Sequence, residues 1–147
     1  MRPTYVVNVE VAIVRDGRYL LIVRGAAETH APGTLSLPGG KVECTGQIED
    51  VLEATAQREA AEEVGLDIAG PLAYVRSTAF VSADGDPVVD IVFLARAAAG
   101  APVAGEPDEV AAMLWLTAAE VAADAQTPPW TRLSVARAEE VRQALGW

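Results

Sequence analysis

The chain has 147 residues, a length that fits one domain able to bury about two-thirds of its unfolded surface. Eleven basic and twenty-one acidic residues give a formal charge of −10, which argues against nucleic acid or an anionic membrane as a partner. No apolar run approaches the ~20 residues of a membrane span, and the single cysteine, Cys44, excludes an internal disulfide, so we expect a cytoplasmic protein.

The first forty residues alternate between β-prone runs and turns. Met1–Tyr5 leads straight into a strand pattern without the apolar core of a signal peptide. Predicted strands over residues 8–14 and 19–23 flank Asp16-Gly17, a pair that tolerates the positive φ of a tight hairpin turn. A loop over residues 25–33 and a short strand over 35–37 lead into Pro38-Gly39-Gly40, which is expected to interrupt regular structure.

From Asp50 to Val64 the pattern becomes helical. Asp50 is the predicted N-cap, alanines fill the body, and Gly65 stands where a glycine would close the helix. A second hairpin is predicted around Asp84-Gly85-Asp86, between strands over 72–81 and 88–97.

The last third of the chain returns to helices. A loop over residues 98–107 precedes a strand over 113–116, and Thr117 is the predicted N-cap of a helix over 118–123. A final helix is expected over 134–145. The order βββ-α-βββ-αα predicts one α/β domain over residues 1–147, with a mixed β-sheet and helices available for both faces.

Three glutamates share one face of the predicted helix 50–64. At about 100° per residue, Glu59, Glu62 and Glu63 fall within an arc of roughly 100°. A solvated acidic face is the ordinary interpretation, but like charges at this spacing destabilise a helix, and anions in the last turn oppose its dipole. A hard divalent cation with oxygen ligands would reverse both penalties, so both interpretations stay open on spacing alone.

The surrounding residues resemble the Nudix box of the Nudix hydrolase family. Gly39-Gly40-Lys41-Val42-Glu43 is followed by Arg58-Glu59-x-x-Glu62-Glu63-x-Gly65-Leu66, which is similar to the second half of the box, Arg-Glu-U-x-Glu-Glu-x-Gly-U with U a bulky aliphatic residue. Ala60 is small for its aliphatic position. The flanking segments Leu37–Gly40 and Glu109–Leu116 also resemble the family, so that the resemblance covers roughly residues 8 to 120.

The middle of the box departs from the family pattern. The family has Gly, five residues, Glu, seven residues and then Arg, whereas Gly46 and Asp50 occupy the positions counted for that first Glu from either end. The loop over 43–49 is therefore about four residues longer than the pattern, and Asp50, or Glu49 beside it, stands in for the first glutamate.

The resemblance implies a Nudix-like αβα sandwich and a Mg²⁺- or Mn²⁺-dependent hydrolysis of a nucleoside diphosphate linked to another moiety, X. The metal would neutralise diphosphate oxygens and lower the pKa of the attacking water. By position, the implied metal ligands are Glu59, Glu62, Glu63 and the Gly40 carbonyl. The implied catalytic residues are Glu59 as general base, Glu63, and Arg58, which would orient a carboxylate of its own helix.

Other residues have weaker assignments. The base could also come from the loop that carries Glu106, Asp108 and Glu109, and Glu109 is a candidate substrate contact. Arg24 at the end of its strand could grip a phosphate, with a surface role equally open. Three further side chains could also reach a substrate, but an ordinary structural or surface role is favoured for each: His30, Arg76 and Trp130.

Two alternatives to the hydrolase remain. A non-catalytic module on the same fold could bind a nucleotide-like ligand without cleaving it, although a sensor has no need of a full set of metal ligands. An isomerase on this scaffold would need a catalytic cysteine opposite a glutamate, and Cys44 lies inside the box loop instead. The sequence does not identify X, and a homodimer is expected by analogy only.

Overall fold

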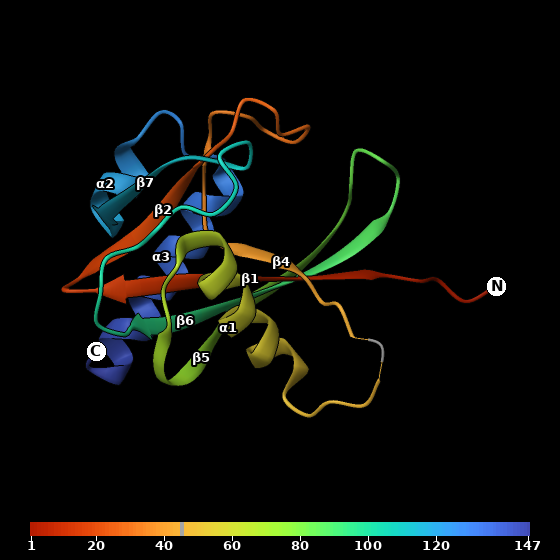
Figure 1. Cartoon of the computed structure of the whole chain (residues 1–147), viewed down its shortest axis with the longest axis horizontal. Coiled ribbons are helices and arrows are strands. Elements are labelled where there is room, and N and C mark those ends of the chain that lie inside the picture. The colour runs from red at the N-terminus through yellow and green to blue at the C-terminus, as the bar shows by residue number, and fades with distance from the viewer. Residues whose placement is uncertain (45) are drawn as a thin grey trace.

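The computed structural model describes residues 1–44 and 46–147, so Thr45 in the predicted long loop 43–49 lies outside the described residues. Its elements follow the order ββββ-α-βββ-αα (Figure 1). The strands are β1 (Val6–Arg15), β2 (Arg18–Arg24), β3 (Leu35–Ser36), β4 (Gly39–Lys41), β5 (Ile68–Val81), β6 (Pro87–Ala97) and β7 (Val110–Thr117). The helices are α1 (Val51–Val64), α2 (Ala118–Ala123) and α3 (Pro129–Leu145).

The strands form one mixed sheet, as the sequence predicts. Its main path runs β3-β2-β1-β6-β5, with β4 paired to β1 and β7 paired to β2. The β1–β6 pair is parallel, and the other pairs are antiparallel. Both predicted hairpin turns are present, and Asp16, Gly17 and Gly85 have the positive φ that such turns require.

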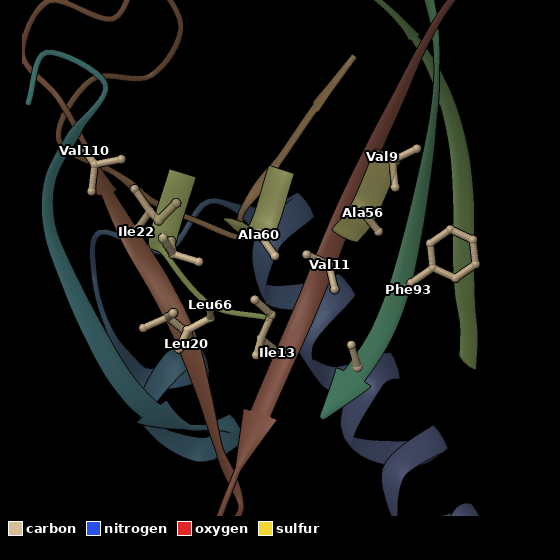
Figure 2. Close-up of a cluster of buried hydrophobic side chains, with 12 residues drawn as sticks. Val9, Val11, Ile13, Leu20, Ile22, Ala56, Ala60, Leu66, Phe93 and Val110 are labelled. Atoms are coloured by element: carbon tan, nitrogen blue, oxygen red, sulfur yellow. The ribbon is translucent and has the colours of Figure 1, made fainter. Parts of the chain in front are cut away.

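Helices cover both faces of the sheet, which confirms the αβα sandwich. Alternation along β1 sends Val9, Val11 and Ile13 towards α1, where they pack on Ala56 and Ala60 in an apolar cluster (Figure 2). On the opposite face, a second cluster joins Ala12 and Val14 of β1 to Val121 of α2 and to Val135 and Ala138 of α3. Among the helices in the described residues, none is both long and apolar enough to cross a membrane.

The prediction that Pro38-Gly39-Gly40 interrupts regular structure is wrong. Gly39–Lys41 forms β4, antiparallel to β1, with Glu10 opposite Gly39 and Val9 opposite Gly40. A Cβ on Gly39 would collide with the backbone carbonyl of Val9, so glycine is what allows this strand to lie so close to β1.

Two helix starts also differ from prediction. Asp50 holds the N-cap position of α1, but its φ of 52° is left-handed and its side chain makes no capping hydrogen bond. Helix α3 begins at Pro129, not at residue 134, because a proline in the first turn has no N–H that needs a partner. By contrast, Thr117 forms a complete capping box with Glu120, and Gly65 closes α1 in a left-handed conformation, both where the sequence placed them.

Candidate active site

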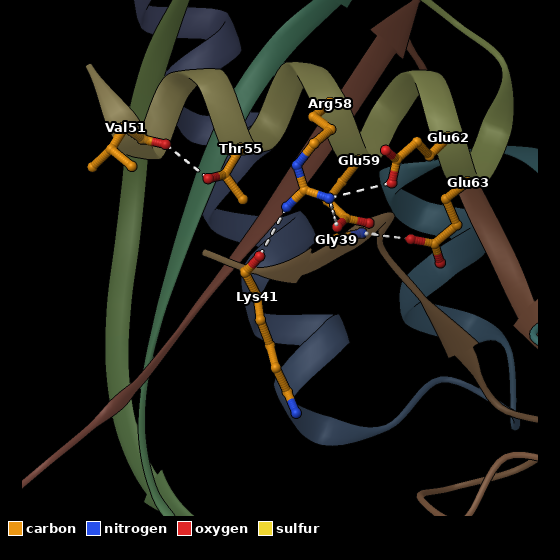
Figure 3. Close-up of polar contacts among 8 residues, drawn as sticks. All are labelled: Gly39, Lys41, Val51, Thr55, Arg58, Glu59, Glu62 and Glu63. Atoms are coloured by element: carbon orange, nitrogen blue, oxygen red, sulfur yellow. Dashed lines mark hydrogen bonds and ion pairs between the residues drawn. The ribbon is translucent and has the colours of Figure 1, made fainter. Parts of the chain in front are cut away.

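The last two turns of α1 carry the predicted site residues, and Arg58 ties two of them together (Figure 3). The Arg58 guanidinium lies 2.9 Å from a carboxylate oxygen of Glu59 and 3.2 Å from one of Glu62. Its other terminal nitrogen donates to the carbonyl of Lys41 on β4, at 2.9 Å. The expected contact of Arg58 with carboxylates of its own helix is therefore present, and the hydrogen bond to β4 fixes the guanidinium in place.

Glu63 points towards β4 and occupies a partly buried position. One carboxylate oxygen accepts a hydrogen bond from the backbone N–H of Gly39, at 3.1 Å. Burial is the main cause that raises the pKa of Glu63 from 4.5 to about 7. The carboxylates of Glu59 and Glu109 contribute to the rise, and the Gly39 N–H and Arg24 oppose it. At neutral pH, this position would gain from a nearby positive charge.

Glu59 lies against Gly40, where a Cβ would collide with its carboxyl group. The glycine therefore lets the strand approach the Glu59 carboxylate. Burial raises the pKa of Glu59 above its usual value, with the ion pair to Arg58 acting in the opposite direction and Glu62 adding to the rise. The predicted role of the Gly40 carbonyl as a metal ligand stays a prediction.

A loop places two more carboxylates opposite the helix. Residues 103–105 are fastened to the end of α1, because the N–H groups of Val103 and Gly105 donate to the carbonyls of Val64 and Glu63, at 2.8 and 2.9 Å. Gly105 is needed there, since a Cβ would lie 2.6 Å from the Glu62 carbonyl.

The result is an acidic hollow of about 360 Å³, lined by Glu59, Glu62, Glu63, Gly105, Glu106 and Glu109. Asp108, the third base candidate from this loop, is not among the lining residues. The backbone of Asp108 instead lies against Gly25.

The donor set of the acidic hollow fits a hard divalent cation. All five of its acidic side chains offer carboxylate oxygens, the ligands that such ions prefer. Within residues 1–44 and 46–147, however, no three acidic, histidine or cysteine side chains already converge as a metal cage. Since Arg58 holds Glu59 and Glu62, full coordination by the helix would require these two side chains to turn away from the guanidinium.

A second, larger cavity of about 510 Å³ adjoins the acidic hollow, and Glu63 lines both. We call it the substrate-side pocket. Arg24, Arg76, His30 and Trp130 line it. The Arg24 guanidinium is already paired with Glu28, at 2.8 Å, and also donates to the His30 carbonyl.

Among the pocket residues that were not singled out from the sequence are Asn8 and Glu10 of β1 and Asp90 of β6. Asp90 is buried, and it accepts a hydrogen bond from the Asn8 side chain at 2.7 Å. A charged residue inside the apolar run 88–95 was the available signal, since charged side chains are rarely buried without partners.

Comparisons with known proteins find relatives in both sequence and fold. A family model for the NUDIX domain matches residues 4–137. A MutT NUDIX hydrolase from Burkholderia pseudomallei is 30% identical, with a TM-score of 0.75 over 91% of this chain and 98% of that one. A search of curated proteins found no match.

Two more distant solved structures share the fold. The MutT protein of Methanosarcina mazei Go1 is 21% identical, with a TM-score of 0.78 over 97% of this chain and 99% of that one. The NUDIX domain of Shewanella oneidensis NrtR, solved with ADP ribose, is 20% identical, with a TM-score of 0.70 over 98% of this chain and 90% of that one.

Proposed function

The chain belongs to the Nudix hydrolase family, whose members act on pyrophosphate bonds, and we propose that it hydrolyses a nucleoside diphosphate derivative with divalent metal held in the acidic hollow. The observation that carries the proposal is the position of Glu63, which lines both the acidic hollow and the substrate-side pocket. A substrate bound next to Glu63 would have its diphosphate beside the carboxylates of the hollow and its remaining groups in the substrate-side pocket. The ADP ribose bound to the NrtR domain is a ligand of this chemical kind.

Glu59, Glu62 and Glu63 are the proposed protein ligands of Mg²⁺ or Mn²⁺, together with the Gly40 carbonyl. When bound, the cation would neutralise diphosphate oxygens and lower the pKa of a water molecule. Arg58 keeps Glu59 and Glu62 oriented through its contacts with both carboxylates.

Glu59 is the proposed general base. Burial raises its pKa above the usual value, which makes its carboxylate a better proton acceptor near neutral pH. Glu106 and Glu109 line the same hollow and are the competing candidates for this role. Arg24, which lines the pocket near Glu63, is proposed to contact a phosphate, and Glu109 to contact the substrate. A cytoplasmic location, one domain over residues 1–147 and a possible homodimer stay predictions.

The test is an activity panel. The purified protein is incubated with nucleoside triphosphates, sugar nucleotides and dinucleoside polyphosphates in Mg²⁺, in Mn²⁺ and in EDTA, while phosphate-containing products are followed. Glu63→Gln keeps the shape of the side chain and removes its charge, and Glu140→Gln makes the same change at an exposed position of α3.

Metal-dependent cleavage that Glu63→Gln loses and Glu140→Gln keeps would support the proposal, and the best substrate would begin to identify X. Tight binding of a nucleotide with no turnover in either metal would contradict it. That result would favour the non-catalytic binding module.

A further inference from the structure

The floor of the substrate-side pocket holds two carboxyl groups in contact. Asn8 lies directly opposite Asp90 in the parallel β1–β6 ladder, and Glu10 is two residues further along the same face of β1. Glu10 and Asp90 both line the pocket, and Glu10 lies close enough to Asp90 for the two carboxyl groups to interact. Burial, followed by this contact, raises the pKa of Glu10 well above its usual range. We call Asn8, Glu10 and Asp90 the floor cluster.

A purely structural role explains the floor cluster poorly. Two neighbouring acids, with Asp90 buried and Glu10 half-buried, destabilise a fold unless other groups satisfy them. Within the described residues, no salt bridge joins either acid to a basic side chain. Of the two arginines that line the same pocket, Arg76 donates to the Ser134 hydroxyl at 2.9 Å, and Arg24 is paired with Glu28.

Aromatic side chains stand at the pocket's mouth. Trp130, in the first turn of α3, is 49% exposed rather than buried as an anchor of that helix. Its ring lies 5.7 Å from the His30 ring, at an interplanar angle of 30°. Phe80, which also lines the pocket, is 48% exposed. A cavity lined by both exposed rings and buried polar groups suits a flat heterocycle, and 510 Å³ falls within the range of ordinary ligand sites.

We infer that the substrate-side pocket binds a heterocyclic ring of the substrate through an amino group directed at Glu10 and Asp90. This inference rests on the proposed function, because it assigns the ring of the proposed nucleoside diphosphate derivative to this cavity. It makes Glu10 and Asp90 specificity-determining residues, and Asn8 a positioning residue that acts through its hydrogen bond to Asp90.

The hydrogen-bonding capacity of the floor cluster gives the reason. Carboxylate oxygens accept hydrogen bonds, and Asn8 occupies one oxygen of Asp90, so the other oxygens of Glu10 and Asp90 are open to a donor from the ligand. An amino group supplies donors to them. A carbonyl at the same place would bring its lone pairs against carboxyl oxygens and leave buried acceptors unpaired, which costs about 1–3 kcal/mol.

The test is calorimetric binding of nucleoside monophosphates in EDTA. These ligands carry no diphosphate linkage, so neither catalysis nor metal enters the measurement. In the pairs AMP and IMP, and CMP and UMP, a carbonyl replaces an amino group at one ring position, and GMP differs from IMP by one added amino group. We expect the amino member of at least one pair to bind about 10-fold tighter or more, the ratio that corresponds to about 1.4 kcal/mol.

Two variants and a control connect that ratio to the floor cluster. Asp90→Asn and Glu10→Gln each replace carboxyl oxygens by an amide, and we expect each to bring the ratio close to 1. Asp84→Asn makes the same change at the exposed β5–β6 turn and should leave the ratio unchanged. Glu10→Gln keeps the test valid if Asp90→Asn fails to fold, since it leaves the Asn8–Asp90 hydrogen bond in place.

Equal affinities within all three pairs, no binding of any of the five monophosphates, or a preference that survives both variants would overturn the inference. The activity panel separates the two proposals. Metal-dependent cleavage in the panel, together with equal binding of the members of each monophosphate pair, leaves the function standing and this inference wrong. A preference for the amino member in binding, without any cleavage in the panel, would support this inference and contradict the proposed function.

Discussion

Two groups of carboxylates lie on either side of Glu63, and they are built differently. The acidic hollow gathers side chains from helix α1 and the loop that carries Glu106 and Glu109, and its members are partly open to solvent. The floor cluster gathers its side chains from strands β1 and β6, and Asp90 is only 5% exposed. The buried carboxylate of Asp90 needs a hydrogen-bond donor, which Asn8 supplies, whereas partly exposed carboxylates can stay charged in solvent until a cation binds.

Strand β4 separates the two groups. Gly39 lies opposite Glu10 of the floor cluster and donates its N–H to Glu63, while Gly40 lies against Glu59 of the acidic hollow. Changes on the two sides of this strand should therefore affect different steps. We expect the acidic hollow to govern metal and turnover, and the floor cluster to govern which ring binds.

The largest expected effect is at Glu59. Glu59→Gln should lower kcat by about 10²–10⁴-fold, because it removes the proposed general base and one proposed ligand of the metal. Binding of nucleoside monophosphates in EDTA should change by less than about twofold. Glu53→Gln, on the first turn of the same helix and outside the hollow, is the matched control. If Glu59→Gln weakens ring binding as much as turnover, the separation of the two regions is wrong.

Substitutions at the two glycines of β4 should have separate effects, one on stability and the other on activity. Gly39→Ala places a methyl group against the rigid backbone carbonyl of Val9, and we expect a loss of about 1–3 kcal/mol in the free energy of unfolding. Gly40→Ala meets only the movable end of the Glu59 side chain, so stability should change little while kcat falls.

Urea denaturation and kcat measured on the same preparations would check this division. Gly46→Ala is the control, since a Cβ there meets no atom within 4 Å. Equal stability of the Gly39→Ala and Gly40→Ala proteins would show that the backbone contact of Gly39 is not the constraint.

The pH dependence of stability should reveal the raised pKa of Glu63. Its pKa rises from 4.5 to about 7 on folding, so the folded chain holds a proton that the unfolded chain releases between these values. The stability of the metal-free protein should therefore fall as pH rises through this window. Glu63→Gln should match the wild type below pH 4.5 and exceed it by about 1–3 kcal/mol at pH 8.

Urea unfolding in EDTA at several pH values would measure that gain. Saturating Mg²⁺ at pH 8 should stabilise the wild type and reduce the advantage of Glu63→Gln. If the stability gained by Glu63→Gln does not depend on pH, the titration of the Glu63 carboxyl is not its cause.

Local spacing explains what could be predicted from the sequence. Glu59, Glu62 and Glu63 share a face because helix geometry fixes residues three and four apart, and Thr117 caps α2 through a contact three residues away. The alternating and apolar runs were likewise enough to predict a mixed sheet covered on both faces.

The floor cluster depends on register, which no local pattern gives. Asn8 and Asp90 are 82 residues apart and meet only because β1 and β6 pair in parallel with these two residues opposite each other. Strand β4 was missed for a related reason. Its glycines alone indicate an interruption of regular structure, and only the pairing with β1 makes them a strand. The start of α3 was missed because two prolines in sequence indicate a stop as readily as a first turn.

The smallest predicted effect is at Trp130. It tests whether Trp130 and the floor cluster contact the same bound ligand. Trp130→Leu keeps an apolar side chain in the first turn of α3 but removes the ring beside His30. Stacking is worth about 0.5–1.5 kcal/mol beyond area, so the preferred monophosphate should bind about 2–10-fold more weakly. The ratio of affinities within each pair should stay the same, because stacking on a ring face does not depend on the amino group. Calorimetry on Trp130→Leu and Asp90→Asn, alone and combined, would show whether the two losses add. A lost ratio in Trp130→Leu alone would mean that ring orientation, and not the carboxyl pair, selects the ligand.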